Sequence, residues 1–320
     1  MEPDGRDDTW QQPRVCVLGS AMNTTNVDMV RAWREAGVDA ALRSPLDTPS
    51  SGSIVIGRLD VLPTLDGVEP GLLALLLLGR RGLRVLNRAE ALLAVHDKLL
   101  TARHLGRAGL PHPETSVWRG ERDVPLEPPL VVKPRFGSWG RDVLLCRDAA
   151  DVSRMREAVH ERPWFRRHGA LVQEFVQPRG YDLRLIVAGG GVVGAGKRVA
   201  ARGEWRTNVA LGGRVSRVEP SAAARSLAIA AASAVGADFV GVDLLPLGED
   251  GYAIIELNGA VEFDDGYSLS DRGIHLDVAA ALDLPRAVRR PLIRPAESVA
   301  RSRSGSGAAR PGRPAREGGS

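Results

Sequence analysis

The sequence contains little cysteine, no long apolar run and no internal repeat. Its two cysteines, Cys16 and Cys146, are far apart in the 320 residues, and each lies in an apolar segment. We therefore expect buried free thiols rather than a disulfide framework or a metal pair. The longest apolar run, Leu72 to Leu78, has seven residues, whereas a membrane-spanning helix needs roughly 20. Because the polar first residues also lack a signal-peptide core, we expect a cytoplasmic protein with no membrane partner.

Residues 286–320 carry most of the positive charge. Nine arginines and two glutamates give this segment a charge of +7, which leaves −3 for the rest of a chain whose net charge is +4. A mildly acidic body lacks the basic face that nucleic-acid binding requires, so nucleic acid is not an expected partner. The segment has few large apolar residues, and we expect it to be disordered, as we do residues 1–13. A weak electrostatic tether to an acidic partner is the functional alternative for this tail.

Apolar periodicity predicts two kinds of architecture along the chain. From residue 14 to 95, short apolar strands such as Val15 to Leu18 alternate with helical patterns, which indicates a small parallel α/β domain. Asn87 and Glu90 have the spacing of a capping pair at a helix start, and Asp97 can cap the helix that follows. Farther along the chain, strands and hairpins dominate, and they predict an α+β body.

One glycine-rich segment fits two phosphate-loop patterns at once. Gly189, Gly191 and Gly194 satisfy G-x-G-x-x-G, and an overlapping P-loop pattern reaches Lys197. Arg198 then stands where the P-loop needs a hydroxyl for magnesium, and the segment lies between two β-patterned runs rather than between a strand and a helix. We therefore interpret the segment as a glycine-rich hairpin turn.

A lysine followed by a glycine loop forms the first candidate site. Lys133 ends an apolar strand, and Gly137, Ser138 and Gly140 follow it. Small residues let backbone N–H groups approach an anion closely, while the lysine supplies a point charge to a phosphate. Such a segment could cover a nucleotide triphosphate. A solvent-facing lysine before an ordinary glycine turn is the alternative.

Three oxygen donors near the end of the body form the second candidate site. Asp243 lies inside an apolar strand, where an unpaired carboxylate would be costly. Glu256 and Asn258 are two residues apart in the next strand and therefore share a face. If the strands pair, the three side chains converge, and Mg²⁺ prefers such hard ligands together with water and phosphates. A hairpin with its polar face in water is the alternative, which the apolar strands disfavour.

Further polar residues lie between these two sites. Gln173 and Glu174 end a strand whose edge could bind an adenine, with the carboxylate available for a ribose. Arg198, Arg206 and Asn208 follow the glycine hairpin and could direct positive, hydrogen-bonding groups at a phosphate or a carboxylate.

Taken in order, these motifs resemble the ATP-grasp superfamily, in its RimK-like carboxylate–amine ligase branch. The resemblance spans roughly residues 15–285 and rests on seven short motifs in a specific order: Asp97-Lys98, Val132-Lys133-Pro134 with Gly137 and Gly140, Val172-Gln173-Glu174-Phe175-Val176, Asp182-Leu183-Arg184, Arg206-Thr207-Asn208, Gly241-Val242-Asp243 and Glu256-Leu257-Asn258. It implies an ATP-grasp fold that combines α/β and α+β parts. An N-terminal Rossmann-like domain would occupy residues 14–95, and an ATP-grasp domain 96–285. The latter would comprise a lid at about 111–176 and a metal-binding part at about 177–285.

The resemblance also implies a role for each candidate residue. Two magnesium ions, which manganese could replace, would be bound by Asp243, Glu256 and Asn258. The catalytic residues, placed near the phosphates or the substrate carboxylate, would be Arg184, Arg206 and Asn208. ATP would be bound by a larger set: Lys98, Lys133, Gly137, Ser138, Gly140, Gln173, Glu174, Phe175, Val176, Asp182 and Arg198.

The implied reaction is the ATP-dependent formation of an amide. ATP would phosphorylate a carboxylate of a peptide, carrier protein or metabolite, and an amine, expected to be a glutamate-like amino acid, would attack the acyl phosphate. Paired subunits are common in the family, so a homo-oligomer is compatible with the resemblance. A non-catalytic ATP-binding regulatory protein is the alternative, although retention of the metal positions and both lysines argues against it.

The sequence departs from the family after Asn258. Glutamate-adding members usually continue with a small residue and a proline, whereas this chain reads Gly259-Ala260-Val261-Glu262-Phe263. Glu262-Phe263 is closer to the ligases of lysine and arginine biosynthesis, which extend the C-terminal glutamate of a small acidic carrier protein. The identity of the acceptor therefore stays open.

Overall fold

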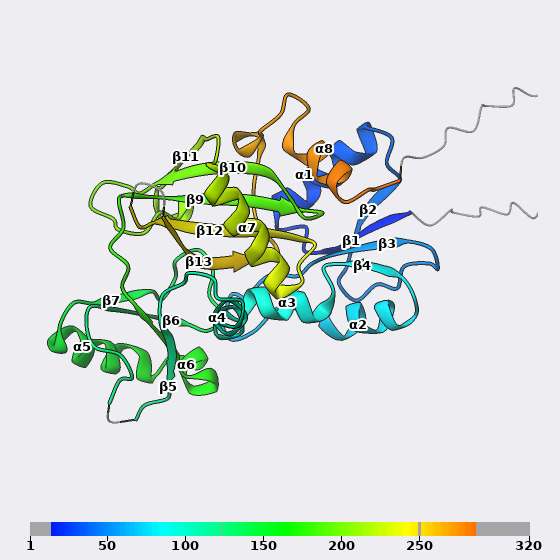
Figure 1. The fold of residues 1–320 in the computed structure, drawn as a ribbon. Coiled ribbons are helices and arrows are strands. Elements are labelled where there is room, and N and C mark those ends of the chain that lie inside the picture. The colour runs from blue at the N-terminus through cyan, green and yellow to red at the C-terminus, as the bar shows by residue number, and fades with distance from the viewer. Residues whose placement is uncertain (1–13, 122, 249–250, 286–320) are drawn as a thin grey trace, which may run out of the picture. The chain divides into compact units, whose positions relative to one another are not determined.

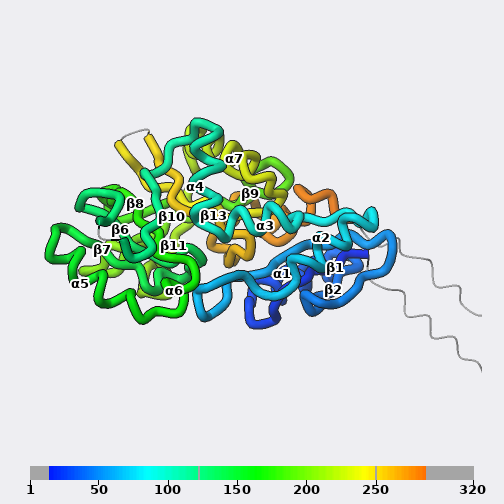
Figure 2. The backbone as a smooth tube through the Cα atoms, turned by 90° about the horizontal axis from the view of Figure 1, so that it is seen from below, coloured from blue at the N-terminus to red at the C-terminus, as the bar shows by residue number. Residues whose placement is uncertain are grey.

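The computed structural model describes residues 14–121, 123–248 and 251–285, so the segments expected to be disordered lie outside it. The described chain forms three sheets (Figures 1 and 2). The strands are β1 (Val15–Gly19), β2 (Ala40–Arg43), β3 (Ile54–Arg58), β4 (Arg84–Leu86), β5 (Thr115–Trp118), β6 (Leu130–Pro134), β7 (Leu144–Cys146), β8 (Ala170–Glu174), β9 (Tyr181–Ala188), β10 (Gly191–Val199), β11 (Arg214–Arg217), β12 (Phe239–Pro246) and β13 (Tyr252–Asn258). The helices are α1 (Thr24–Glu35), α2 (Leu72–Arg80), α3 (Ala89–His96), α4 (Lys98–Arg107), α5 (Ala149–His160), α6 (Pro163–His168), α7 (Ala222–Val235) and α8 (Ile274–Ala281), with short 3-10 turns at Val209–Leu211 and Asp265–Tyr267.

The first sheet has the order β2-β1-β3-β4, and its neighbouring strands are parallel. Strand β1 is buried along its whole length, as its continuous apolar sequence predicts for a parallel strand. Helix α1 buries Met29, Val30 and Trp33, whose helical spacing places them on one face. The parallel α/β arrangement expected for this segment is therefore present.

The third sheet is antiparallel in the order β11-β10-β9-β12-β13, with α7 packed across it (Figure 1). Strands β9 and β10 form a hairpin that turns at Gly189 and Gly190, which confirms the hairpin interpretation of the glycine-rich segment. Gly196 in β10 has a packing role, because a Cβ there would lie 2.6 Å from Cε1 of Tyr267. That glycine makes room for an aromatic ring rather than for a phosphate.

The second sheet is also antiparallel, in the order β5-β8-β6-β7. It has a core of its own, which includes Leu130, Val132, Trp164 and Phe165, whereas the first and third sheets share their two cores. In both views this sheet, with α5 and α6, lies at the opposite end from β1 and β2 (Figures 1 and 2). No helix in the described part of the chain is both long and apolar enough to cross a membrane.

Two local expectations have opposite outcomes. Asp97 accepts hydrogen bonds from the amides of Leu99 and Leu100 and caps α4, as predicted. The capping pair at Asn87 and Glu90 is wrong, because α3 starts after Arg88 without a side-chain cap. Fully buried Asn87 instead bonds the start of β12: its Nδ2 donates to the carbonyl of Phe239 at 2.6 Å, and its Oδ1 accepts from two amides there. The distant strand outcompetes the local cap. Cys16 and Cys146 are buried and form no disulfide, as expected.

Candidate functional site

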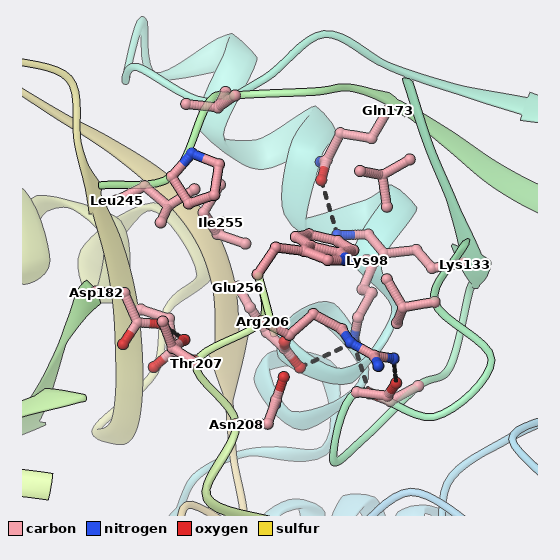
Figure 3. Close-up of a pocket in the computed structure, with 18 of the residues that line it drawn as sticks. Lys98, Lys133, Gln173, Asp182, Arg206, Thr207, Asn208, Leu245, Ile255 and Glu256 are labelled. Atoms are coloured by element: carbon pink, nitrogen blue, oxygen red, sulfur yellow. Dashed lines mark hydrogen bonds and ion pairs between the residues drawn. The ribbon is translucent and has the colours of Figure 1, made fainter. Parts of the chain in front are cut away.

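Two buried lysines line the same pocket (Figure 3). Lys98 Nζ donates to the carbonyl of Gly137 at 2.6 Å and lies 2.9 Å from Glu256 Oε1, whereas Lys133 Nζ donates to Gln173 Oε1 at 2.7 Å. Lys133 is only 6% exposed, and its hydrogen-bond partner is neutral. Burial, aided by the charge of Lys98, lowers the pKa of Lys133 to about 8. A buried ammonium group with a neutral partner is suited to receive an anion such as a phosphate.

The glycine loop after Lys133 is held by the segment that precedes the first 3-10 turn. Arg206 Nη1 donates to the carbonyl of Gly140 at 2.9 Å, and Arg206 also forms a two-pronged ion pair with Glu204. Hydrogen bonding by Arg206 lowers the pKa of Glu204 to about 2. Gly140 has a φ of +69°, and a Cβ there would meet Asn208 Oδ1 at 2.7 Å. The structure therefore brings the predicted loop residues and the predicted Arg206 and Asn208 together.

An apolar slot forms the other side of this pocket. The rings of Phe175 and Trp205 meet edge to face at 5.7 Å, and further apolar side chains line the slot: Val131, Val143, Val176, Leu245 and Ile255. Such a slot beside two lysines can take a flat heterocycle that carries phosphates. The predicted Gln173 and Glu174 also line it. Sequence reasoning missed Trp205, Leu245 and Ile255, although the alternation of apolar residues in β12 and β13 offered a weak signal for the last two.

A buried network of two arginines and two aspartates contributes three lining residues to the pocket: Asp182, Arg198 and Asp243. Arg184 Nε and Nη2 donate to the two oxygens of Asp243 at 2.8 and 2.9 Å, and Arg198 Nη2 donates to Asp243 Oδ2 at 2.7 Å. Burial alone would raise the pKa of Asp243, but the two arginines outweigh it and hold this pKa well below its usual range.

Asp182 belongs to the same network. Its oxygens accept from Arg198 Nε at 2.7 Å, from Arg198 Nη2 and from Thr207 Oγ1 at 2.6 Å. The carboxylate expected at a nucleotide thus already has three protein donors, and its role toward ATP stays a prediction. Thr207 was not among the predicted site residues, although it stands between Arg206 and Asn208.

The three predicted metal ligands lie on adjacent strands. Asp243 and Glu256 are direct partners in the β12–β13 pair, and Asn258 follows Glu256 on the same face. Within residues 14–121, 123–248 and 251–285, no group of three or more His, Cys, Asp or Glu side chains could hold a metal ion by itself. Two carboxylates and one amide are the kind of set that Mg²⁺ takes together with water and substrate phosphates. Asp243 already accepts from two arginines, and Asn258 Oδ1 accepts from the amide of Ala260 at 3.0 Å, so the role of this set stays a prediction.

A second cavity, of about 550 Å³, adjoins the lysine pocket. The two share four wall residues: Ser138, Arg198, Asn208 and Glu256. Its other lining residues include two groups far apart in the sequence: Thr24, Thr25, Asp28 and Asp60 in the first, and Glu262, Phe263, Asp264 and Tyr267 in the second. A molecule in this cavity would lie next to the phosphate end of a ligand in the pocket.

The N-terminal segment holds the loop that follows β13. Asn23 Nδ2 donates to the carbonyl of Ala260 at 3.1 Å, Thr25 Oγ1 donates to that of Phe263 at 3.1 Å, and Arg58 Nη2 to that of Val261 at 2.6 Å. Arg58 is fully buried and, among the described residues, has no carboxylate within ion-pair distance. These contacts set the position of Glu262. Sequence reasoning missed them, because partners about 200 residues apart leave no local pattern.

Comparisons with known proteins agree with this geometry. Residues 95–282 match the model of the RimK-like ATP-grasp domain family. The chain is 33% identical over 257 residues to the glutamate–LysW ligase ArgX of Sulfurisphaera tokodaii, covering 78% of this chain and 91% of ArgX. It is 33% identical over 218 residues to the human beta-citrylglutamate synthase B, covering 64% of this chain and 55% of that protein.

A solved structure is also similar in fold. The ATP-grasp ligase PsnB, solved with a phosphomimetic variant of its minimal precursor, Mg and ADP, aligns with a TM-score of 0.59 and 19% identity. The alignment covers 85% of this chain and 98% of PsnB. At this identity the match concerns the fold alone, and it confirms the ATP-grasp fold expected from the motif order.

Proposed function

This chain belongs to the RimK-like ATP-grasp family and is an ATP-dependent ligase, and we propose that it joins an amine to a carboxylate through an acyl phosphate. The observation that carries this proposal is the junction of two spaces at Glu256. On one side lie two buried lysines and an apolar slot, and on the other lies a roomy polar cavity. A phosphoryl group bound at that junction can be passed from a nucleotide in the pocket to a molecule in the cavity.

ATP occupies the pocket in this proposal. The adenine lies in the slot between Phe175 and Leu245, beside the strand edge that Gln173 and Glu174 provide, and Val176 closes it. Lys98 and Lys133 bind the phosphates, and the loop from Gly137 through Ser138 to Gly140 covers them with backbone N–H groups. Asp182 and Arg198 form an ion pair that supports the phosphate end of the pocket.

Magnesium completes the nucleotide site. Asp243, Glu256 and Asn258 would hold two Mg²⁺ ions together with the phosphates, and the ions would neutralise the charge of the phosphoryl group. Lys98, already 2.9 Å from Glu256, orients that carboxylate toward the same place. PsnB, solved with Mg and ADP, supports this assignment through its fold.

The reaction itself needs no nucleophilic side chain. A substrate carboxylate oxygen attacks the γ-phosphorus, ADP departs, and the amine then attacks the acyl carbon and releases phosphate. Arg184 lines the cavity and keeps Nη1 outside its ion pair with Asp243, so it can hold the carboxylate. Arg206 and Asn208, at the glycine loop, stabilise the transferred phosphoryl group.

We infer that the acceptor is a carboxylate of a carrier protein, peptide or small molecule. ArgX, which this chain covers over 91% of its length, is named for a ligation of glutamate to LysW, and the beta-citrylglutamate synthase is named for a small-molecule product. The cavity of about 550 Å³ can admit either the end of a peptide or a whole metabolite.

ADP release tests the proposal. Purified protein receives ATP and Mg²⁺ with pooled amino acids and amines, with and without glutamate-terminated peptides, and product masses are measured in the active wells. We expect ADP release only when both substrates are present, with a product equal to their summed masses minus water. ATP binding without ADP release in any pool would contradict a ligase acting on these classes of substrate.

A further inference from the structure

The walls of the second cavity are predominantly negative. Five carboxylates and two arginines line it, and both arginines are already paired with Asp243. Glu256 is paired with Lys98, and Asp28 with exposed Arg31. The remaining carboxylates have no ion-pair partner among the described residues: Asp60, Glu262 and Asp264. The side of the cavity away from the lysine pocket therefore has an excess of negative charge.

Protein groups neutralise these three carboxylates only weakly. Asp60 accepts a hydrogen bond from the amide of Val61 at 2.6 Å, and Asp264 accepts one from the amide of Gly266 at 2.8 Å. Burial raises the pKa of Asp60 to about 6; the amide of Val61 and the charge of buried Arg58 oppose this rise, and Glu69 and Glu262 add to it. Half-buried Asp60, with exposed Glu262 and Asp264 lining the same cavity, is suited to a positively charged ligand.

Tyr267 gives an independent indication of a ligand. Its side chain is 4% exposed and lines the cavity, and its hydroxyl has no hydrogen-bond partner within the described residues. Burial raises the pKa of this hydroxyl, and the charges of Arg184 and Arg198 oppose the rise. A hydroxyl group that faces the cavity without a protein partner is free to bond a molecule with an N–H or O–H group there.

The chemistry of these walls selects among possible ligands. A further metal ion is disfavoured, since no group of three or more carboxylates, histidines or cysteines in the described chain could hold one. A second carboxylate, as in glutamate, would face like charges at the Asp60, Glu262 and Asp264 wall. An organic ammonium or guanidinium group would find carboxylate acceptors and a hydroxyl group along these walls.

We propose that the cavity receives an amine substrate that carries a second, positively charged amino or guanidino group, bound by Asp60, Glu262, Asp264 and Tyr267. This inference rests on the proposed function. One amino group of the substrate, as the free base, attacks the acyl phosphate; the C–N bond forms, the C–O bond to phosphate breaks, and phosphate leaves with the electron pair. The proton lost by the nitrogen goes to solvent. The second group stays protonated and holds the substrate in register.

Calorimetry on the full chain loaded with Mg²⁺ and a non-hydrolysable ATP analogue tests this inference. The probes are L-lysine, L-ornithine, L-arginine, L-glutamate and L-norleucine, an uncharged analogue of lysine. We expect at least one cationic probe to bind about tenfold or more tightly than norleucine, and glutamate to bind more weakly than norleucine. Equal binding of norleucine and all cationic probes, or tightest binding by glutamate, would overturn the inference.

Single substitutions test which carboxylates of the cavity contribute to cation binding. Glu262→Gln, at an exposed loop position, should lower the affinity for the preferred cation about threefold or more without affecting the fold. Asp60→Asn should lower this affinity further. Asp265→Asn, an exposed neighbour that does not line the cavity, should leave the affinity unchanged. An equal loss of affinity in Asp265→Asn and Glu262→Gln would contradict the assignment of Glu262 to cation binding.

The two proposals fail in different ways. If ATP analogue binding and ADP release occur but no cation preference is found, only the cationic substrate is wrong. If ATP is neither bound nor turned over, the proposed function itself is wrong, whatever the amine probes show.

Discussion

The lysine pocket and the acidic cavity meet at Glu256, yet they differ in nearly every property. The pocket combines two buried lysines with an apolar slot, and most of its polar residues belong to short motifs that are contiguous in sequence. The cavity is larger, three of its five carboxylates have no ion-pair partner in the described chain, and its acidic residues come from segments about 200 residues apart. The pocket contains most of the motif residues on which the family resemblance rests, whereas most of the carboxylates of the cavity lie outside those motifs.

The comparison also shows where electrostatic cost is concentrated. In the pocket, a positive group, Lys133, has a neutral partner, and in the cavity a negative group, Asp60, has an amide. Burial shifts both pKa values toward the neutral form. Each is a site where a ligand of opposite charge would restore the balance, which is the basis of the assignments to ATP and to a cationic amine.

The largest effect is expected at Glu256, one of the four residues that the two spaces share. Glu256→Gln removes a proposed magnesium ligand and the partner of Lys98, so ADP release should fall about 1000-fold or more while the circular dichroism spectrum is kept. Glu157→Gln, exposed on α5, is the matched control and should be fully active. Full activity of Glu256→Gln would contradict a role for Glu256 in phosphoryl transfer.

Lys133→Met should weaken ATP binding while it stabilises the folded protein. The KM for ATP should rise about 100-fold, because a phosphate partner is lost. The free energy of unfolding should increase by roughly 1–3 kcal/mol near neutral pH, because a buried charge is removed. Titration with ATP and chemical denaturation measure the two. A drop in stability with unchanged ATP affinity would make Lys133 a structural residue only.

The pKa of Lys133 predicts a pH dependence confined to the pocket. Since its pKa is about 8 in the folded protein, against 10.5 ordinarily, the ammonium group loses its proton above about pH 8 and phosphate must then bind with proton uptake. ATP affinity should fall above pH 8, by up to about tenfold per pH unit. Below about pH 8 the buried charge of Lys133 lowers the free energy of unfolding. This free energy rises between about pH 8 and 10.5, because only the unfolded chain then keeps the proton. Lys133→Met should lose both dependences in binding and denaturation titrations.

The smallest effect is expected from a substitution that displaces Tyr267 in the cavity wall. Gly196→Ala places a Cβ 2.6 Å from the ring of Tyr267, so it should cost about 1–3 kcal/mol of stability and raise the KM for the amine more than that for ATP. Gly191→Ala, on the same strand, meets nothing closer than 3.9 Å and is the control. Equal effects of the two substitutions on the amine KM would show that Tyr267 does not position this substrate.

The sequence allowed much of the fold and of the pocket to be predicted. Alternating and helical apolar patterns locate β1, α1, β12 and β13 because local periodicity reports burial directly. The family resemblance named Lys98, Lys133 and Glu256, and the structure brings these residues to one pocket. Their proposed roles await the measurements above.

The rest depended on contacts that leave no local signal. Asn87 has the pattern of a helix cap but bonds the start of β12, since a buried strand end offers it three partners. Arg58 and Asp60 lie at and just after the end of β3, and their importance follows only from the loop that packs against them. Specificity determined by such tertiary contacts cannot be derived from motif order.

Isotope transfer tests the central claim most directly. In whichever pool supports turnover, the acceptor carboxylate is labelled with ¹⁸O, and the released inorganic phosphate is analysed by mass spectrometry. Activation through an acyl phosphate predicts one ¹⁸O atom in each phosphate, because the carboxylate oxygen leaves with it. Unlabelled phosphate accompanying amide formation would contradict the account.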